Sequence, residues 1–392
     1  MICPPNLRAA GVVFLTLGSL AAPARALVTL NDGTDKIYAS GTFTMGYDSN
    51  ISASADNTAD TTVSANLGLE YQRHAGLIAV NANANFAINR YLKNSSYNNV
   101  DPSYSLEFDK ASGRTTGTLN FGAVRSSQAD AAVNFYTTAW NYSADLNVHY
   151  PVIDRYSFAG SLDYGFLDYT ETSNQPLVNL STYSSSLSLF YVLSGDRDLF
   201  ATYRYRFEQS SISTSTTDDA FNLGMHGKLI WEIKGSLSVG YQIRDPRGTS
   251  FAGAPQQSSY HDLTSQASAS WMANRKLTFN GSLSKDFATT ATDATTDTTA
   301  GTLDVTYVLN AVLSANAGLG GGENRFLGPA GFVPGTTKER RDYYFTWNAG
   351  VSYTFNERLH VSLAYVYFQN WSNLGFAVFN RNRITLSLSS RW

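Results

Sequence analysis

The last ten residues of the chain alternate between apolar and polar side chains. Ile384, Leu386, Leu388 and Trp392 share one parity, and Thr385, Ser387, Ser389 and Arg391 share the other. Successive side chains of a β-strand point to opposite faces, so this segment has one apolar and one polar face. Such a strand fits a wall with lipid on one side and water on the other. The pattern therefore predicts a transmembrane β-barrel.

The same alternation recurs in pairs of strand-length segments from Lys36 onward, without a run of helical period. One pair runs from residue 140 to 150 and, after a turn at residues 151–154, from 156 to 166. A first strand, eight such hairpins and the closing strand give about eighteen strands, with sixteen as the alternative. We therefore predict an all-β, antiparallel, up-and-down barrel. A soluble β-helix, propeller or sandwich is disfavoured, because no fixed motif recurs.

The connections between these segments alternate between short turns and long polar stretches. The long stretches are rich in Ser, Thr, Asp, Asn and Gly and cover residues 48–61, 170–180, 209–219, 245–261, 289–298 and 320–342. In outer-membrane barrels the short turns face the periplasm and the long loops face outward. Both termini are then periplasmic. The even spacing predicts one barrel domain over residues 27–392.

The N-terminal residues have the composition of a secretory signal. Arg8 precedes an apolar stretch from Ala9 to Ala22, and Ala24 and Ala26 provide the small residues of a cleavage site. We predict a signal peptide over residues 1–26; a retained membrane helix is the alternative. The one cysteine, Cys3, lies within that signal, so the mature chain would have neither disulfides nor cysteine chemistry.

Composition agrees with a membrane barrel. Charged residues make up 15% of the chain, against about 25% in soluble domains, and aromatic residues make up 13%. Mean hydropathy is nevertheless −0.21, and after the signal no stretch reaches the ~20 apolar residues of a membrane helix. A net charge of −3 gives no reason to expect nucleic acid as a partner.

The polar parity of the strands supplies the candidate functional residues. Glu107, Arg204, Arg206 and Arg244 fall on the face opposite the apolar side chains, so they are expected to point inward. Arg204 and Arg206 are the candidates for a constriction or an anion-attracting stripe. The alternative is a network of inward ion pairs that stiffens the wall. A barrel of about eighteen strands is too wide for its side chains to fill, which favours a water-filled or loop-restricted lumen.

Catalysis is not expected. The histidines are explained as solvated polar residues, and neither a metalloprotease nor a serine-hydrolase motif accompanies them. No cofactor or metal is implied. Expected partners are outer-membrane lipid and lipopolysaccharide. The acidic loop pair Asp218 and Asp219 could bridge divalent cations to lipopolysaccharide, and the alternative is that these are solubilising loop charges.

Four segments resemble a family of bacterial outer-membrane β-barrel porins of unassigned substrate. They are Tyr47 to Ile51, Tyr203 to Arg206, Gly240 to Gln242, and Arg383 to Trp392. The terminal Trp392 also resembles the signal that the barrel-assembly machinery recognises. This resemblance implies the fold and the outer membrane but provides no ligand residues. Some members are associated with polysaccharide export.

We therefore expect a porin-like channel for passive diffusion of small hydrophilic solutes. The alternatives are a barrel for polysaccharide export, a plugged structural barrel or an outer-membrane hydrolase. Most aromatic residues have outward parity, which favours the porin over a sugar path. A homo-oligomer is compatible with this class, although no segment marks a subunit interface.

Overall fold

The computed structural model describes residues 26–170, 177–212, 214–248, 259–328 and 339–392. The predicted signal peptide therefore lies outside the described residues, except for Ala26. Within the described ranges, no helix is both long and apolar enough to cross a bilayer.

Long antiparallel strands make up nearly all of the described chain. They are β1 (Val28–Leu30), β2 (Asp35–Asp48), β3 (Asp60–Arg73), β4 (Ala79–Tyr91), β5 (Asn99–Lys110), β6 (Thr116–Asp130), β7 (Phe135–Ile153), β8 (Tyr156–Thr170), β9 (Leu180–Ser194), β10 (Arg197–Ser210), β11 (Ser215–Ile230), β12 (Ile233–Arg247), β13 (Tyr260–Asn274), β14 (Leu277–Thr289), β15 (Thr295–Val308), β16 (Leu313–Leu327), β17 (Arg341–Asn356), β18 (Leu359–Ser372) and β19 (Phe379–Arg391). Short 3-10 helices lie at η1 (Asn31–Gly33), η2 (Ser95–Tyr97) and η4 (Gly375–Ala377).

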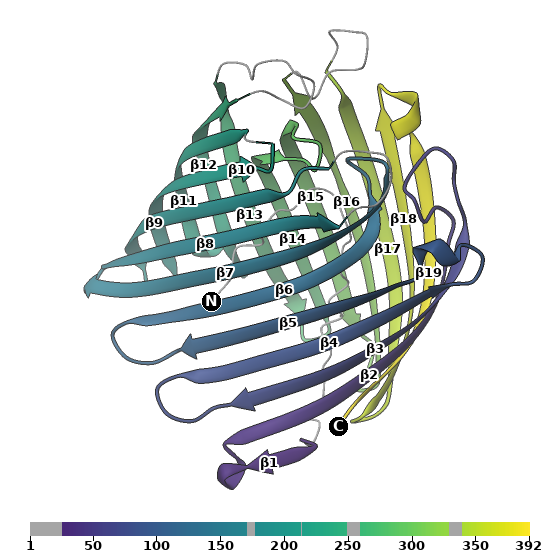
Figure 1. Ribbon diagram of the computed structural model, residues 1–392. Coiled ribbons are helices and arrows are strands. Elements are labelled where there is room, and N and C mark those ends of the chain that lie inside the picture. The colour runs from purple at the N-terminus through teal and green to yellow at the C-terminus, as the bar shows by residue number, and fades with distance from the viewer. Residues whose placement is uncertain (1–25, 171–176, 213, 249–258, 329–338) are drawn as a thin grey trace.

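These strands close into a barrel. Each strand from β2 to β19 pairs with the next, and β19 pairs back to β2 from Arg383 opposite Asp48 to Arg391 opposite Ser40. Figure 1 shows β19 returning beside β2. The prediction of an all-β antiparallel barrel of about eighteen strands is confirmed.

The closing seam extends beyond β19. The backbone of Trp392 exchanges two hydrogen bonds with Ala39, at 2.9 and 2.8 Å. The short strand β1 then pairs with residues 35–37 of β2. Since β3 occupies the whole opposite edge of β2, β19, Trp392 and β1 follow one another along the same edge. The seam therefore leaves almost no open strand edge, which in lipid would carry unpaired backbone groups.

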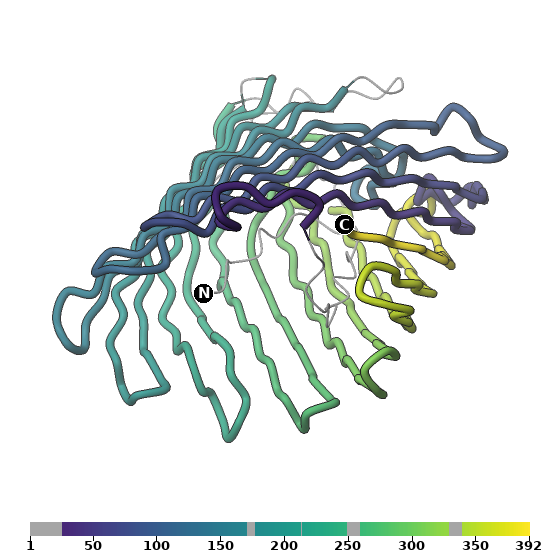
Figure 2. The backbone as a smooth tube through the Cα atoms, turned by 90° about the horizontal axis from the view of Figure 1, so that it is seen from below, coloured from purple at the N-terminus to yellow at the C-terminus, as the bar shows by residue number. Residues whose placement is uncertain are grey.

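The wall has two chemically different faces, as the alternation predicted. Phe221 and Leu223 of β11 are 54% and 58% exposed and point outward. Gln242 and Arg244 of the neighbouring β12 are 0% exposed and point inward. Seen from below, the purple-to-teal strands and the green-to-yellow strands form opposite walls of the barrel (Figure 2). Lipid-facing apolar side chains and water-facing polar side chains thus come from the same strands.

Three of the predicted long loops are shorter than expected. Strands β10 and β11 leave residues 211–214 as their connection, β14 and β15 leave residues 290–294, and β16 continues to Leu327. These stretches are polar because water contacts both faces of the strands there. Their polarity does not mark the point where backbone pairing ends. Thr216 and Asp218, for example, still pair in register with Glu208 and Arg206. The loop at residues 49–59 agrees with the prediction, and the predicted loops around 175, 253 and 334 lie partly outside the described residues.

Candidate functional site

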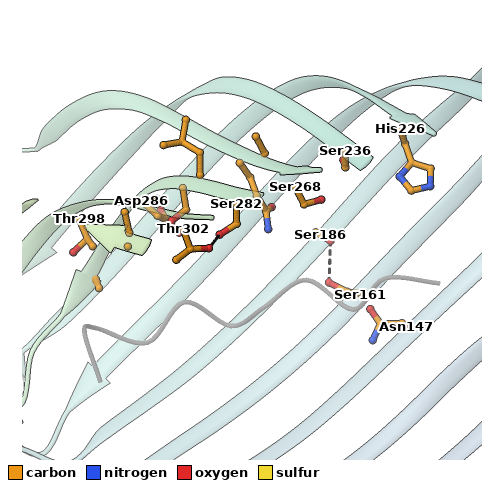
Figure 3. A pocket seen from close by; sticks show the side chains of 18 of the residues that line it. Asn147, Ser161, Ser186, His226, Ser236, Ser268, Ser282, Asp286, Thr298 and Thr302 are labelled. Atoms are coloured by element: carbon orange, nitrogen blue, oxygen red, sulfur yellow. Dashed lines mark hydrogen bonds between the residues drawn. The ribbon is translucent and has the colours of Figure 1, made fainter. Parts of the chain in front are cut away.

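The barrel encloses a cavity of about 1310 Å³. Its lining comes from both walls and mixes small polar side chains with glycine, alanine and several aromatic residues. The small polar side chains line much of the wall. These include Thr116, Asn147, Ser161, Ser186, Ser188, Ser236, Ser268, Ser282, Ser284, Thr298 and Thr302. Figure 3 shows several of them directed into the cavity. Short hydroxyl side chains at inward positions keep the lumen both wide and wettable.

Neighbouring hydroxyl groups bond to one another along the wall. Ser161 and Ser186 lie 2.8 Å apart on β8 and β9, and Ser282 and Thr302 lie 2.7 Å apart on β14 and β15. A hydroxyl can donate and accept at once, so each retains capacity for water or a solute. This part of the wall can therefore exchange hydrogen bonds with a passing polar molecule.

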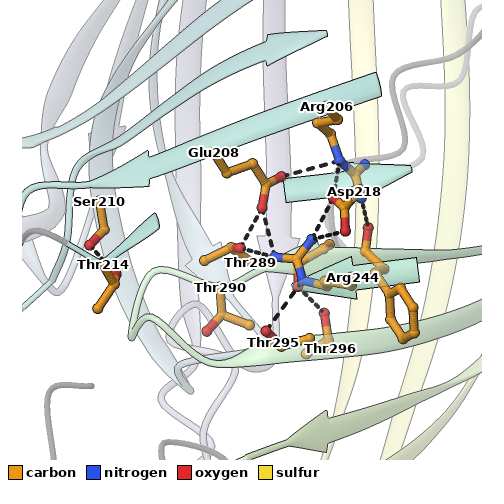
Figure 4. Close-up of polar contacts among 12 residues, drawn as sticks. Arg206, Glu208, Ser210, Thr214, Asp218, Arg244, Thr289, Thr290, Thr295 and Thr296 are labelled. Atoms are coloured by element: carbon orange, nitrogen blue, oxygen red, sulfur yellow. Dashed lines mark hydrogen bonds and ion pairs between the residues drawn. The ribbon is translucent and has the colours of Figure 1, made fainter. Parts of the chain in front are cut away.

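The predicted arginines gather toward the end of the barrel that carries the longer loops. The side chain of Arg244 is 0% exposed and binds the equally buried Asp218 at 3.1 and 2.8 Å through Nη1. Its Nη2 donates to Glu208 at 2.7 Å. Thr289 donates to the same carboxylate at 2.6 Å. Figure 4 shows this network, with Arg244 between the two acids.

Arg206 and Arg204 extend the network across β10 to β14. Arg206 pairs with Asp218 at 2.6 Å and donates to the backbone carbonyl of Phe287 at 2.7 Å. Arg204 holds both oxygens of Asp286 at 2.8 Å. Such forked contacts suit the planar guanidinium, which donates two parallel hydrogen bonds to a carboxylate.

The network is balanced in charge. Three guanidinium groups, those of Arg204, Arg206 and Arg244, meet three carboxylates, those of Glu208, Asp218 and Asp286. The geometry favours a stiffened wall over a stripe of free positive charge. The expectation that Asp218 lies in a loop is wrong. Asp218 lies in β11 opposite Arg206 of β10, and its side chain points inward.

Glu107 does not join this network. It lies near the end of β5, beside a short turn, where it accepts a hydrogen bond from Asn81 at 3.1 Å. It lines the cavity together with Asp109. The structure therefore brings the three predicted arginines together and keeps the predicted glutamate apart.

Two connections of the purple-to-teal wall, residues 49–59 and 131–134, lie over the loop end of the cavity. Ala53 of loop 49–59 packs against Ala129 and Phe379 in a small apolar cluster. Asn134, in the connection between β6 and β7, donates to the carbonyl of Ala53 at 3.3 Å. Ala53, Ala129 and Phe379 all line the cavity. These connections thus form part of its roof.

Arg340 connects this roof to β17, on the opposite side of the barrel mouth. It precedes β17 and pairs with Asp342 at 2.5 Å, while donating to the carbonyls of Ala131 and Ala132 at 3.2 and 2.7 Å. Its guanidinium lies 4.4 Å from the ring centroid of Phe326. Strands β18, β19 and β2–β5 stand between β17 and β6 in the sheet order. Arg340 therefore bridges the mouth of the barrel.

A second set of connections meets at the same end. The amide of Val178 donates to the carbonyl of Ala291 at 2.8 Å, and Thr214 donates to Asp293 at 2.6 Å. Burial raises the pKa of the Asp293 carboxyl, and the hydrogen bond from Thr214 partly offsets that rise. The other oxygen of this carboxylate, Oδ2, has no hydrogen-bond partner among the described residues. Connection 290–294 thus leans toward the β8–β11 side of the mouth.

Some aromatic side chains face inward, against the general trend. Phe190 and Phe200 contact each other with tilted rings and centroids 5.3 Å apart near the turn end of β9 and β10, and both line the cavity. The missing side chain of Gly224 makes room for Phe200, since a Cβ there would meet the ring at 2.4 Å. Tyr97 and Tyr136 form a further inward contact at 4.8 Å.

Sequence reasoning missed Arg340 and the inward aromatics. Arg340 lies just before a strand, where alternation makes no statement about direction. Phe190 and Phe200 have the inward parity, and following that parity along β9 and β10 would have found them.

The sequence of the second half of the barrel matches a known family. Residues 220–391 match the family described as Putative beta-barrel porin 2. The expected resemblance to outer-membrane porins is confirmed. The match includes Gly240 to Gln242 and all but the last residue of the segment Arg383 to Trp392, on which that resemblance partly rested.

Comparison with solved structures supports the fold. The chain is similar to OccK2 (OpdF) of Pseudomonas aeruginosa, with a TM-score of 0.51, 10% identity, and coverage of 91% of this chain and 97% of that one. It also resembles OpdK of the same organism, with a TM-score of 0.48, 11% identity, and coverage of 91% and 99%. A FrpB iron transporter from Neisseria meningitidis matches with a TM-score of 0.49, 8% identity, and coverage of 91% and 81%. No curated protein is significantly similar in sequence.

Proposed function

We propose that this protein is a porin-like channel of the bacterial outer membrane that lets small hydrophilic solutes diffuse passively. The observation that carries the proposal is a closed, two-sided wall around a cavity of about 1310 Å³ lined by hydroxyl and amide groups. Barrels of 16–18 strands leave an aqueous channel. The roof of connections at the loop end would restrict the size of the solute.

The orientation and processing of the chain belong to the same proposal. Short turns would face the periplasm and the longer loops the outside, which places both termini in the periplasm. Residues 1–26 would be removed as a signal, leaving residues 27–392 as one barrel domain. We assign no catalytic role, because the matched family and the similar solved structures are described as porins, outer-membrane proteins or transporters.

Single-channel recording tests the function directly. Refolded protein in a planar lipid bilayer should give stable conductance steps that rise with salt concentration. A correctly folded barrel that remains electrically silent would contradict the channel and favour a plugged structural barrel. Folding is checked in the same preparation by β-rich circular dichroism and by the heat-dependent shift in gel mobility.

A role in polysaccharide export remains the second candidate, and inward aromatic groups favour it. Phe190 and Phe200 line the cavity, and Tyr91, Tyr97 and Tyr136 cluster at the loop end of β4 and β7 with centroids 4.8–6.3 Å apart. Sugars stack on such rings. Neutral maltodextrins added to the bilayer chamber should interrupt the current if the lumen holds a sugar chain. Uninterrupted current, at sugar concentrations that block a maltodextrin-specific channel run in parallel, would favour the general porin.

Trp392 is proposed as the recognition signal for the barrel-assembly machinery. Its ring lies 4.3 Å from the guanidinium of Arg358, and its backbone extends the closing seam. Changing Trp392 to Ala should slow assembly in cells while leaving refolding in detergent nearly unchanged. Arg358→Ala is the matched control, because it removes the ring contact but keeps the terminal aromatic. Equal loss in both variants would indicate a purely structural role.

A further inference from the structure

The charges inside the barrel differ in whether they are paired. At the loop end, Arg204, Arg206 and Arg244 are matched by three carboxylates. Arg381, which also lines the cavity, is held by Asp48 at 3.0 Å to each oxygen. The positive charges that the alternation predicted inside the lumen are thus largely neutralised.

Three acidic residues of the cavity lining have no such partner. They are Glu107 and Asp109 on β5 and Asp198 on β10. Within the described ranges, no Lys or Arg nitrogen lies within 4.0 Å of any of the three carboxylates. Each lies close to a short turn, since β5 ends at Lys110 and β10 begins at Arg197.

Their local contacts leave these carboxylates free to act on mobile ions. Glu107 accepts a hydrogen bond from the neutral amide of Asn81, which leaves its charge uncompensated. One oxygen of Asp109 is shielded from solvent and has no hydrogen-bond partner among the described residues. Asp198 stands directly opposite His226 in the β10–β11 register. An unsatisfied carboxylate oxygen in a cavity favours a water molecule or a cation beside it.

One unpaired positive charge, that of Arg383, also lines the cavity. This residue of β19 forms no ion pair with any described residue. It lies opposite Asp48, at the loop half of the barrel. The unpaired lining charges are therefore three carboxylates against one guanidinium, and the three carboxylates lie toward the turn end. Within a low-dielectric wall, such an imbalance concentrates ions of the opposite sign.

We propose that Glu107, Asp109 and Asp198 make this lumen selective for cations, so that small cationic and neutral solutes pass more readily than anionic ones. This inference rests on the proposed channel function. It reverses the anion preference expected from Arg204 and Arg206, because those two arginines are already paired. With this excess of negative charge, partly screened by salt, the cation-to-anion permeability ratio of the wild type should exceed one.

The reversal potential in a KCl gradient tests the proposal. Refolded wild-type protein in a planar bilayer should show a potential of the sign produced by preferred K⁺ flow. The triple variant Glu107→Gln, Asp109→Asn and Asp198→Asn should bring the permeability ratio to about one or below. The matched control is the double variant Glu70→Gln and Arg391→Gln, which removes an inward carboxylate together with the arginine paired with it and so leaves the net lumen charge unchanged. That control should not lower the ratio as the triple variant does.

The possible outcomes separate the two proposals. Open channels with an anionic or zero preference in the wild type, or an unchanged ratio in the triple variant, would overturn the cation selectivity alone. A silent bilayer from folded protein would overturn the channel function and the selectivity with it. Liposome swelling gives a second measurement: cationic solutes should enter wild-type vesicles faster than anionic solutes of matched size, and the triple variant should remove the difference.

Discussion

The two ends of the lumen contain the same kinds of side chain but use them differently. At the loop end, Arg206, Asp218 and Arg244 are buried and paired, and folded connections lie above them. At the turn end, Glu107 and Asp198 line the cavity, and neither has a basic partner among the residues that the structure describes. The difference teaches that an inward charge in a barrel is structural where it is enclosed and paired, and functional where it faces water.

Enclosure explains the pairing at the loop end. Removing an ion from water costs several kcal/mol, which a partner offsets only if geometry and further hydrogen bonds are good. The carboxylate of Glu208 meets this condition, because it accepts from both Arg244 and Thr289. At the turn end Glu107 and Asp198 line an open cavity, where water can solvate a carboxylate and a basic partner is not required.

The largest test of this contrast removes the centre of the network. Changing Arg244 to Ala leaves Asp218 and Glu208 buried without their main partner, and we expect a loss of about 3–5 kcal/mol in the free energy of unfolding. Urea unfolding of refolded protein in detergent, followed by tryptophan fluorescence, measures it. Arg325→Ala is the control, since its pair with Glu339 is exposed and should contribute about 0–1 kcal/mol. Equal losses in the two variants would remove the distinction between enclosed and exposed charges.

The next test removes the contacts of Arg340 that hold the connections over the loop end of the cavity. Arg340→Ala removes the charged hydrogen bonds to Ala131 and Ala132, each worth about 1.5–3 kcal/mol before relaxation. Unfolding should become easier by about 2 kcal/mol, and single-channel conductance should rise because the roof loses its tie to β17. The neighbouring Arg341→Ala is the matched control, as this side chain is 45% exposed and contacts Glu323 and Tyr343 at the surface. Unchanged conductance in Arg340→Ala would show that the roof does not limit flow.

The smallest expected effect depends on pH and concerns Asp293 in the connection between β14 and β15. Its pKa is raised by burial, so the folded state favours the protonated carboxyl. The stability that this group contributes is therefore greatest below its unfolded pKa and is lost as pH rises through the folded value. Asp293→Asn should increase stability at neutral pH and flatten the profile on the acidic side.

Denaturant midpoints of wild type and Asp293→Asn, measured at a series of pH values, test this linkage. The variant keeps an oxygen that can accept from Thr214, and Asn tolerates the positive φ of 61° at this position. Parallel profiles for the two proteins would mean that the carboxyl titrates as it does in the unfolded chain.

Much of the fold could be predicted from single strands. Alternation along β11 placed Phe221 and Leu223 outward and identified the inward parity of Arg204, Arg206 and Arg244, because direction in a strand depends only on position. The strand count followed from the same pattern. The connections at residues 211–214 and 290–294 were misjudged, since polar composition does not distinguish a loop from a strand with water on both sides.

The candidate site was less accessible to that reasoning. The alternation along β12 predicts that Arg244 points inward. It does not predict that Asp218 and Glu208 bind Arg244, because those contacts join different strands. Arg340 lies before β17, where no alternation applies, and its partners Ala131 and Ala132 lie more than 200 positions earlier in the chain. Whether an inward charge is free or neutralised is decided by such contacts.

By itself, the amino-acid sequence determined a closed wall with lipid on one face and water on the other, because strand geometry converts every second side chain into one surface. Only the tertiary structure decided which lumen charges cancel and which remain, because ion pairs form between strands and across the mouth of the barrel. Those contacts depend on the curvature and stagger of the whole sheet, which no single strand encodes.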